Sequence, residues 1–287
     1  MVETTLDHPI AGGRLSGTLA TPEGLGPWPV VLVIGGSGAT DRDGNNPLLP
    51  EPCSSFRRLA GALSARGLAS LRYDKRGVGR SVIAGLSESA LRFDDLVDDA
   101  VALARLLRAD ERFSDLVLFG HSEGALVAAL AANATPPELL VCASGAGERA
   151  SDLMRRQIVQ TLPADLASPA VRALDALERQ TPATDVPDTL AVLFRPTVQP
   201  YLMSWFRHSP AEVLANLAVP IMLLHGAADT QVPADQARLL QAAHPEAELC
   251  VIAGMDHLLA VDGDYDAGAR RIAGDITAQL ARAAAHA

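Results

Sequence analysis

The chain has 287 residues, of which 48% are hydrophobic and 4% aromatic, and its formal net charge at pH 7 is −10. This length suits one large α/β domain, or one such domain with an insertion, and the hydrophobic content is enough for a sizeable core. The negative charge argues against a nucleic-acid partner, and no apolar run approaches the ~20 residues that a membrane helix requires.

Three cysteines, Cys53, Cys142 and Cys250, are far apart in the chain and form no C-x-x-C pair. This spacing fits buried, reduced thiols rather than a disulfide framework or a zinc site. The first residues lack the basic stretch followed by an apolar core that marks a signal peptide. The expected location is therefore the cytoplasm, and the sequence leaves the oligomeric state open, a homodimer included.

Strand-like and helical patterns alternate along the chain after a predicted β-ribbon over residues 1–28. The predicted strands are 29–34, 69–73, 116–119, 139–143, 220–226 and 248–252. The predicted helices are 56–65, 92–108, 125–132, 234–243 and 268–284. Continuous apolar strands that alternate with helices indicate an α/β fold, with a mostly parallel sheet covered on both faces.

One segment breaks this alternation, because no convincing strand lies between Gly145 and Leu217. It contains many of the prolines and three short helical patterns. We expect a helical cap over residues 146–217, inserted into a core made of residues 1–145 and 218–287.

The pattern G-x-S-x-G occurs at residues 120–124, between a predicted strand and a predicted helix. A serine on such a tight turn has its hydroxyl exposed, and glycines are needed beside it because larger side chains would collide with the strand and helix. Ser122 is therefore the predicted nucleophile. Its hydroxyl requires a base to take the proton, and that base requires an acid to orient it.

Both partners are expected at the carboxyl ends of other parallel strands. Asp229 follows the strand at 220–226, and His257 follows the last strand. The chain order Ser, Asp, His is the order typical of α/β-hydrolases. Asp256 is the rival acid, but it adjoins His257 in sequence and neighbouring side chains usually diverge, which favours Asp229.

An acyl-transfer site also needs fixed donors for the oxygen that becomes negative. One predicted donor is the backbone N–H of Glu123, the residue after the nucleophile. The second is expected from the glycine-rich loop at 35–38, with Gly36 as first choice and Ser37 as second. This loop fits neither phosphate-binding pattern, since G-x-x-x-x-G-K-[ST] is absent and no G-x-G-x-x-G follows a strand.

Several polar groups near these positions are interpreted as structural. The Glu123 carboxylate begins a helix, where the helix dipole favours it. His121 is expected to pack beside the serine, and His225 to be a satisfied histidine at a strand end. The polar stretch at 40–45 fits either a rim of the site or a plain surface turn.

Aromatic residues concentrate in the predicted cap, where Phe194, Tyr201, Trp205 and Phe206 lie within thirteen residues. Trp205, followed by Tyr201 and Phe206, is predicted to line an apolar substrate pocket over Ser122. The alternative is that these side chains form the core of the cap itself, and the sequence leaves both readings open.

Taken together, these motifs resemble the α/β-hydrolase superfamily over nearly the whole chain. The matching pieces are GGSG (35–38), YDKRGVGRS (73–81), GHSEG (120–124), HGAAD (225–229) and GMDH (254–257). More narrowly, SGATDRDGNN (37–46) and QPYLMSWFRHSP (199–210) are similar to signatures of capped bacterial carboxylesterases of the dienelactone-hydrolase-like and prolyl-oligopeptidase-like branches. The chain has serine where dienelactone hydrolases have cysteine, and it lacks the propeller of the oligopeptidases.

The resemblance implies an α/β-hydrolase fold and a serine carboxylesterase that uses Ser122, Asp229 and His257 without a metal or other cofactor. The implied partner is a small-molecule ester, with a short to medium acyl chain as the starting hypothesis. The same residues would also serve an amidase, a peptidase, a thioesterase or an acyltransferase. A non-catalytic binding protein on the same scaffold is an alternative from a different class.

Overall fold

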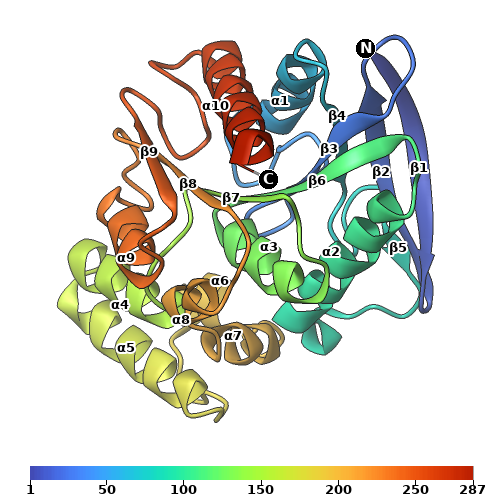
Figure 1. The fold of residues 1–287 in the computed structure, drawn as a ribbon. Helices are drawn as coiled ribbons and strands as arrows, with labels where there is room; N and C mark the ends of the chain where they lie inside the picture. Colours follow the sequence, from blue (N-terminus) through green and yellow to red (C-terminus); the bar gives the residue numbers. More distant parts are fainter. Residues whose placement is uncertain (287) are drawn as a thin grey trace.

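The computed structural model describes residues 1–286, and within them one twisted sheet runs through the molecule (Figure 1). Its strand order is β1-β2-β4-β3-β6-β7-β8-β9, with the short β5 paired to β2. The strands are β1 Val2–Ile10, β2 Gly13–Thr21, β3 Trp28–Ile34, β4 Ala69–Tyr73, β5 Val82–Ile83, β6 Phe113–His121, β7 Leu139–Ala143, β8 Ile221–Gly226 and β9 Glu248–Ile252. All neighbours from β4 to β9 are parallel, which confirms the mostly parallel sheet.

The predicted N-terminal ribbon is present and joins the main sheet. β1 pairs antiparallel with β2, and β2 pairs antiparallel with β4. Gly12, in the turn between the two strands, has φ +77°, a conformation that glycine adopts without strain. The ribbon therefore extends the parallel sheet by two strands at one edge.

Helices cover both faces of the sheet (Figure 1). They are α1 Ser55–Ser64, α2 Phe93–Arg108, α3 Glu123–Ala134, α9 Asp235–Ala243 and α10 Tyr265–His286. α1 and α10 pack together on one face, and α2, α3 and α9 bury their apolar side chains on the other. None of the described helices combines the length and apolarity needed to cross a bilayer.

The sequence pattern of α2 explains its position. Its buried residues recur at helical spacing, with Phe93, Leu96, Ala100 and Leu103 among them. Asp94 and Asp95 lie in its first turn, and arginines lie in its last turn, which suits the helix dipole at both ends. By contrast, β4, β7 and β8 are buried at every residue, as expected for strands covered on both faces.

The segment between β7 and β8 is helical in the part of the chain that the structure describes. It contains α4 Ala150–Thr161, α5 Ala164–Glu178, the 3₁₀ helix η2 Asp188–Leu190, α6 Ala191–Phe194, α7 Gln199–Phe206 and α8 Pro210–Ala215. Three helical patterns were expected; prolines divide the segment further, because Pro163, Pro187 and Pro210 each stand at the start of a helix. The segment has its own apolar cluster, which includes Leu174, Leu177, Phe194 and Phe206.

α7 is attached to α2 by specific contacts. The Ser204 hydroxyl accepts the backbone N–H of Phe93 at 2.7 Å, and the Phe93 ring stacks on Trp205 with a centroid distance of 5.8 Å. Arg207 forms an ion pair with Asp94. A further tether joins Arg195 to Glu88 of the short 3₁₀ helix η1 Glu88–Ala90. The helical segment is thus held to the core at both ends of α7.

Candidate active site

Ser122 stands on the sharp turn between β6 and α3. Its φ of 55° and ψ of −120° are strained for a residue with a side chain. A Cβ on Gly120 would lie 2.1 Å from the Gly124 carbonyl oxygen, and a Cβ on Gly124 would lie 2.4 Å from that of Ile34. Only glycine fits at these two positions, so they allow the turn that holds the Ser122 hydroxyl out of the backbone.

Three side chains from separate strand ends form a continuous hydrogen-bonded chain. The Ser122 hydroxyl lies 3.2 Å from His257 Nε2, and His257 Nδ1 lies 2.8 Å from Asp229 Oδ2. Ser122 follows β6, Asp229 follows β8 and His257 follows β9. The serine, the base and the acid proposed from sequence therefore meet at the carboxyl edge of the sheet.

Asp229 is held as a carboxylate. Its Oδ1 accepts the backbone N–H groups of Gln231 at 3.0 Å and Val232 at 2.8 Å. Burial alone would raise the pKa of Asp229, but the hydrogen bond and charge of His257 and the N–H of Val232 lower it below its ordinary value. Asp256 is engaged elsewhere, because its Oδ1 accepts the N–H of Ala260 at 2.9 Å.

Two other histidines hold the loops of the site. His121 Nε2 lies 2.7 Å from the backbone oxygen of His257, and burial, with a smaller contribution from His257, lowers the pKa of His121 to about 3. His225 Nε2 lies 2.8 Å from the Val232 oxygen, and burial lowers its pKa too. Both rings stay neutral and donate to a backbone carbonyl, which fits the structural interpretation of His225.

A cavity of about 300 Å³ opens beside Ser122. Its apolar wall comes from Leu48, Leu49, Phe56 and Leu258. The other lining residues are small or polar: Gly36, Ser37, Gly38, Thr40, Gly44, Asn46, Ser55, His121, Ser122, Gln231 and His257. Most of the wall therefore belongs to the connection between β3 and α1. Thr40 and Gly44 line it, in the stretch for which the sequence left a rim of the site open, whereas Leu48 and Leu49 were not predicted.

The aromatic residues predicted to line the pocket lie elsewhere. Trp205, Tyr201 and Phe206 are not among the residues that line the cavity at Ser122. Trp205 and Tyr201 pack on Phe93 of α2, and Phe206 is buried within the helical segment. The structure thus favours the packing role that the sequence left open for them, because the rings of Trp205 and Tyr201 attach α7 to α2 and Phe206 lies in the apolar cluster of the helical segment.

The predicted oxyanion donors lie beside Ser122. Gly36 and Ser37 line the cavity, and a Cβ on Gly36 would be 3.2 Å from the Ser122 Cβ. Glu123 is the first residue of α3, whose leading N–H groups have no helical partner. Within the described chain, no hydrogen bond engages the backbone N–H of Gly36, Ser37 or Glu123. These groups are free to meet a ligand oxygen.

Lys75 also belongs to this neighbourhood, although the YDKRGVGRS motif that contains it predicts no role for its side chain. Its ammonium is buried and donates to Glu123 Oε1 at 2.8 Å and to the Gly36 carbonyl at 2.9 Å. It is the only lysine among 287 residues, in a chain with 24 lysines and arginines together. That rarity is the signal by which the sequence could have identified it.

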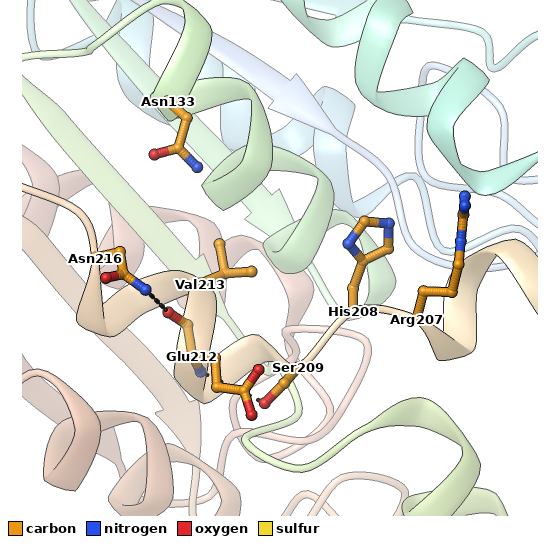
Figure 2. Close-up of a pocket in the computed structure, with 7 residues that line it drawn as sticks. All are labelled: Asn133, Arg207, His208, Ser209, Glu212, Val213 and Asn216. Atoms are coloured by element: carbon orange, nitrogen blue, oxygen red, sulfur yellow. Dashed lines mark hydrogen bonds between the residues drawn. The ribbon is translucent and has the colours of Figure 1, made fainter. Parts of the chain in front are cut away.

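No group of three or more His, Cys, Asp or Glu side chains within the described residues is arranged to hold a metal ion. A second, more open hollow lies at the surface near α8 and shares no residue with the cavity at Ser122 (Figure 2). Asn216 Nδ2, one of its polar groups, donates to the backbone carbonyl of Glu212 at 2.7 Å.

Comparisons with known proteins agree with this architecture. The model of the family described as serine aminopeptidase, S33, matches residues 49–264. Esterase EstD of Thermotoga maritima is 26% identical over 231 residues, which are 80% of this chain and 53% of that protein. The chain thus spans about half the length of this curated relative.

Solved structures with the same fold include Est1E from Butyrivibrio proteoclasticus, with a TM-score of 0.67, 16% identity and coverage of 96% of this chain and 99% of that one. Proline iminopeptidase from Mycobacterium smegmatis has a TM-score of 0.66 and 15% identity, and the alignment covers 98% of this chain and 100% of that one. The sheet order, the serine turn and the family match agree: the chain has the α/β-hydrolase fold and belongs to the serine aminopeptidase S33 family.

Proposed function

We propose that this protein hydrolyses carboxylic esters through an acyl-enzyme formed on Ser122. The observation that carries the proposal is the hydrogen-bonded chain from Ser122 through His257 to Asp229, which opens on a cavity of about 300 Å³. The similarity to Esterase EstD supports the same reaction class.

In the proposed mechanism the Ser122 oxygen attacks the ester carbonyl while His257 Nε2 takes its proton. Asp229 holds Nδ1 of the imidazole and stabilises the ring when it becomes charged. His257 then protonates the leaving alcohol, and water releases the acid through the same base. The N–H of Glu123 and one N–H of the Gly36–Ser37 loop are the proposed oxyanion donors.

An aminopeptidase is the second candidate, since the family description names that activity and proline iminopeptidase shares the fold. An aminopeptidase must bind the positive α-ammonium of a peptide, and an acidic side chain is the usual partner for such a charge. Among the described residues that line the cavity, none is Asp or Glu. The neutral, partly apolar lining supports an uncharged ester.

The cavity volume supports acyl groups of short to medium length. We further propose that residues 146–217 act as a cap, which their separate apolar cluster supports. The free thiols of Cys53, Cys142 and Cys250 support a reducing compartment such as the cytoplasm.

The test is turnover of aryl esters from acetate to decanoate, compared with aminoacyl anilides and thioesters, by wild type and Ser122→Ala. Wild type should prefer esters. The variant should fold normally and lose about 10⁶-fold in kcat, judging from other triads. A serine-reactive phosphonate should label wild type only.

Ser168→Ala is the matched control, because that serine is exposed on α5 and bonds only to the Ala164 carbonyl. It should keep full activity. Ester turnover by Ser122→Ala at the wild-type rate would refute the proposal, and faster cleavage of the anilides would favour the aminopeptidase.

A further inference from the structure

We propose that Lys75 is a positioning residue for the oxyanion hole: its ammonium fixes the Gly36–Ser37 peptide so that the Ser37 N–H, rather than that of Gly36, faces the attacked carbonyl. The inference rests on the proposed function and deepens it. It begins from the buried contacts of Lys75 with Glu123 and with the Gly36 carbonyl.

The geometry of the peptide bond between Gly36 and Ser37 limits where its two polar groups point. A trans peptide is planar, and its C=O and N–H point to opposite sides. The Gly36 carbonyl and the Ser37 N–H belong to one such unit. Because the Lys75 ammonium holds the carbonyl oxygen at 2.9 Å, the Ser37 N–H points away from Lys75 and cannot rotate without breaking that bond. Lys75 thus holds this donor in one direction, while Thr40 and Asn46 donate to the carbonyl of Ser37 itself.

The same ammonium also contacts the other side of the proposed oxyanion hole. Glu123 supplies the other predicted donor through its backbone N–H, and its carboxylate accepts from Lys75 at 2.8 Å. Lys75 therefore joins the loop after β3 to the first residue of α3. The exposed fractions of the Lys75 and Glu123 side chains are 9% and 1%, so water competes little for these bonds.

The shape of a lysine ammonium suits position 75 better than an arginine guanidinium would. An ammonium is compact and has three donors, whereas a guanidinium is a wide planar fork. The contacts of Lys75 run in two directions, to a carbonyl and to a carboxylate, and suit a point charge. Among the 24 lysines and arginines of the chain, all the others are arginines. The one lysine thus stands where a small cation bridges the loop after β3 and the start of α3.

A role in charge balance alone predicts something different. If Lys75 only neutralised Glu123, removal of both charges would restore activity. If Lys75 positions the Ser37 N–H, the neutral double variant stays slow, because the Gly36 carbonyl has lost its donor. The pair Arg76 and Asp99, with N–O distance 2.6 Å, is a matched control because it is also largely buried and begins at the next residue.

The experiment compares wild type with Lys75→Met/Glu123→Gln, Lys75→Met alone and Arg76→Met/Asp99→Asn, each verified as folded by circular dichroism. For the preferred ester we expect the first double variant to lose about 100-fold in kcat with little change in KM, as for loss of one oxyanion donor. Its affinity for a boronic acid that forms a tetrahedral adduct should fall in parallel, and its pH profile should keep its shape. The control pair should stay within about 3-fold of wild type in kcat.

A double variant with a wild-type kcat would overturn the positioning role, as would a slow Lys75→Met whose activity returns in the double variant. Equal losses in the Arg76 and Asp99 control would also overturn it, since any buried pair would then have the same effect. A failure of the proposed function is recognised separately, because Ser122→Ala would then leave the wild-type activity unchanged.

Discussion

The ring of His121 lies against the backbone of His257, with Nε2 2.7 Å from the carbonyl oxygen. Residue 121 precedes the nucleophile and residue 257 carries the proposed base. This contact therefore ties the serine turn directly to the loop after β9. The contact requires a hydrogen on Nε2, and burial disfavours a second proton on the ring.

We predict that folding stability falls as pH drops from about 6.5 to 5. The unfolded chain takes up a proton at the ordinary imidazole pKa of about 6.5, whereas folded His121 does so only at about 3. The folded pKa is depressed, so the stabilising effect is complete above pH ~6.5 and is lost below it, at about 1.4 kcal/mol per pH unit. His225 adds to the slope, since burial lowers its pKa too.

Urea denaturation at pH 7.5, 6.0 and 5.0 measures this slope, and His121→Gln should reduce it by about one proton. Carboxylates ordinarily titrate below this range, and those whose pKa values burial raises, Asp99 and Glu148, contribute equally to wild type and variant. Equal slopes in wild type and variant would show that His121 is not kept neutral by the fold.

Replacement of Asp229 by Asn should lower kcat by about 10⁴-fold without unfolding the protein. The amide keeps the shape of the carboxylate but favours the wrong imidazole tautomer and does not stabilise the charged ring. Ester kinetics measure the loss. Asp256→Asn is the control and should stay within about 3-fold, because Oδ1 can still accept the Ala260 N–H. A larger effect at 256 than at 229 would reverse the assignment of the acid.

Ser122→Gly should be more stable than Ser122→Ala by about 1 kcal/mol. The backbone at 122 has φ 55°, which costs a residue with a Cβ on the order of 1–3 kcal/mol and costs glycine little. For a chain of this size the difference corresponds to roughly 2 °C in Tm. Calorimetry on the two inactive variants compares them directly, and equal melting temperatures would mean that the turn stores no strain.

Trp205→Ala should destabilise the protein by about 2 kcal/mol and leave KM for short esters nearly unchanged. Trp205 stacks on Phe93 and does not line the cavity, so its loss weakens the attachment of α7 rather than substrate contacts. Leu48→Trp should instead change KM and leave the stability unchanged, because Leu48 is 84% exposed at the cavity wall. It should raise KM for long acyl esters with an unchanged Tm. A large rise in KM for Trp205→Ala would indicate that Trp205 contacts the substrate after all.

Local sequence patterns were sufficient to predict most strands of the sheet and the turn that carries Ser122. The sequence pattern predicted β4, β7 and β9 at their observed bounds. In β7 this was possible because a strand buried on both faces leaves a continuous apolar run. Chain order and strand ends also brought Asp229 and His257 to Ser122. The serine turn was predictable because collisions at Gly120 and Gly124 constrain its sequence.

The cavity wall was not predictable, because non-local contacts shape it. The loop that contains Leu48 is held by Asn45 Oδ1, which accepts the Ser54 N–H, and by Arg42, which pairs with Asp74. Neither contact has a periodic signature. Lys75 was missed for the same reason, since its partners lie 39 and 48 residues away. The sequence also could not separate Gly36 from Ser37 as donor, since that depends on which way one peptide faces.

Leu48 and Leu49, in the connection between β3 and α1, supply part of the apolar wall of the cavity, while the proposed reacting groups follow β6, β8 and β9. The same connection also contains the proposed oxyanion loop at Gly36 and Ser37, ahead of the two leucines. Residues 46–53 take no part in strand pairing, so we expect substitutions there to leave the sheet intact. Directed evolution aimed at new esters would therefore gain more from randomising this connection than from randomising the cap.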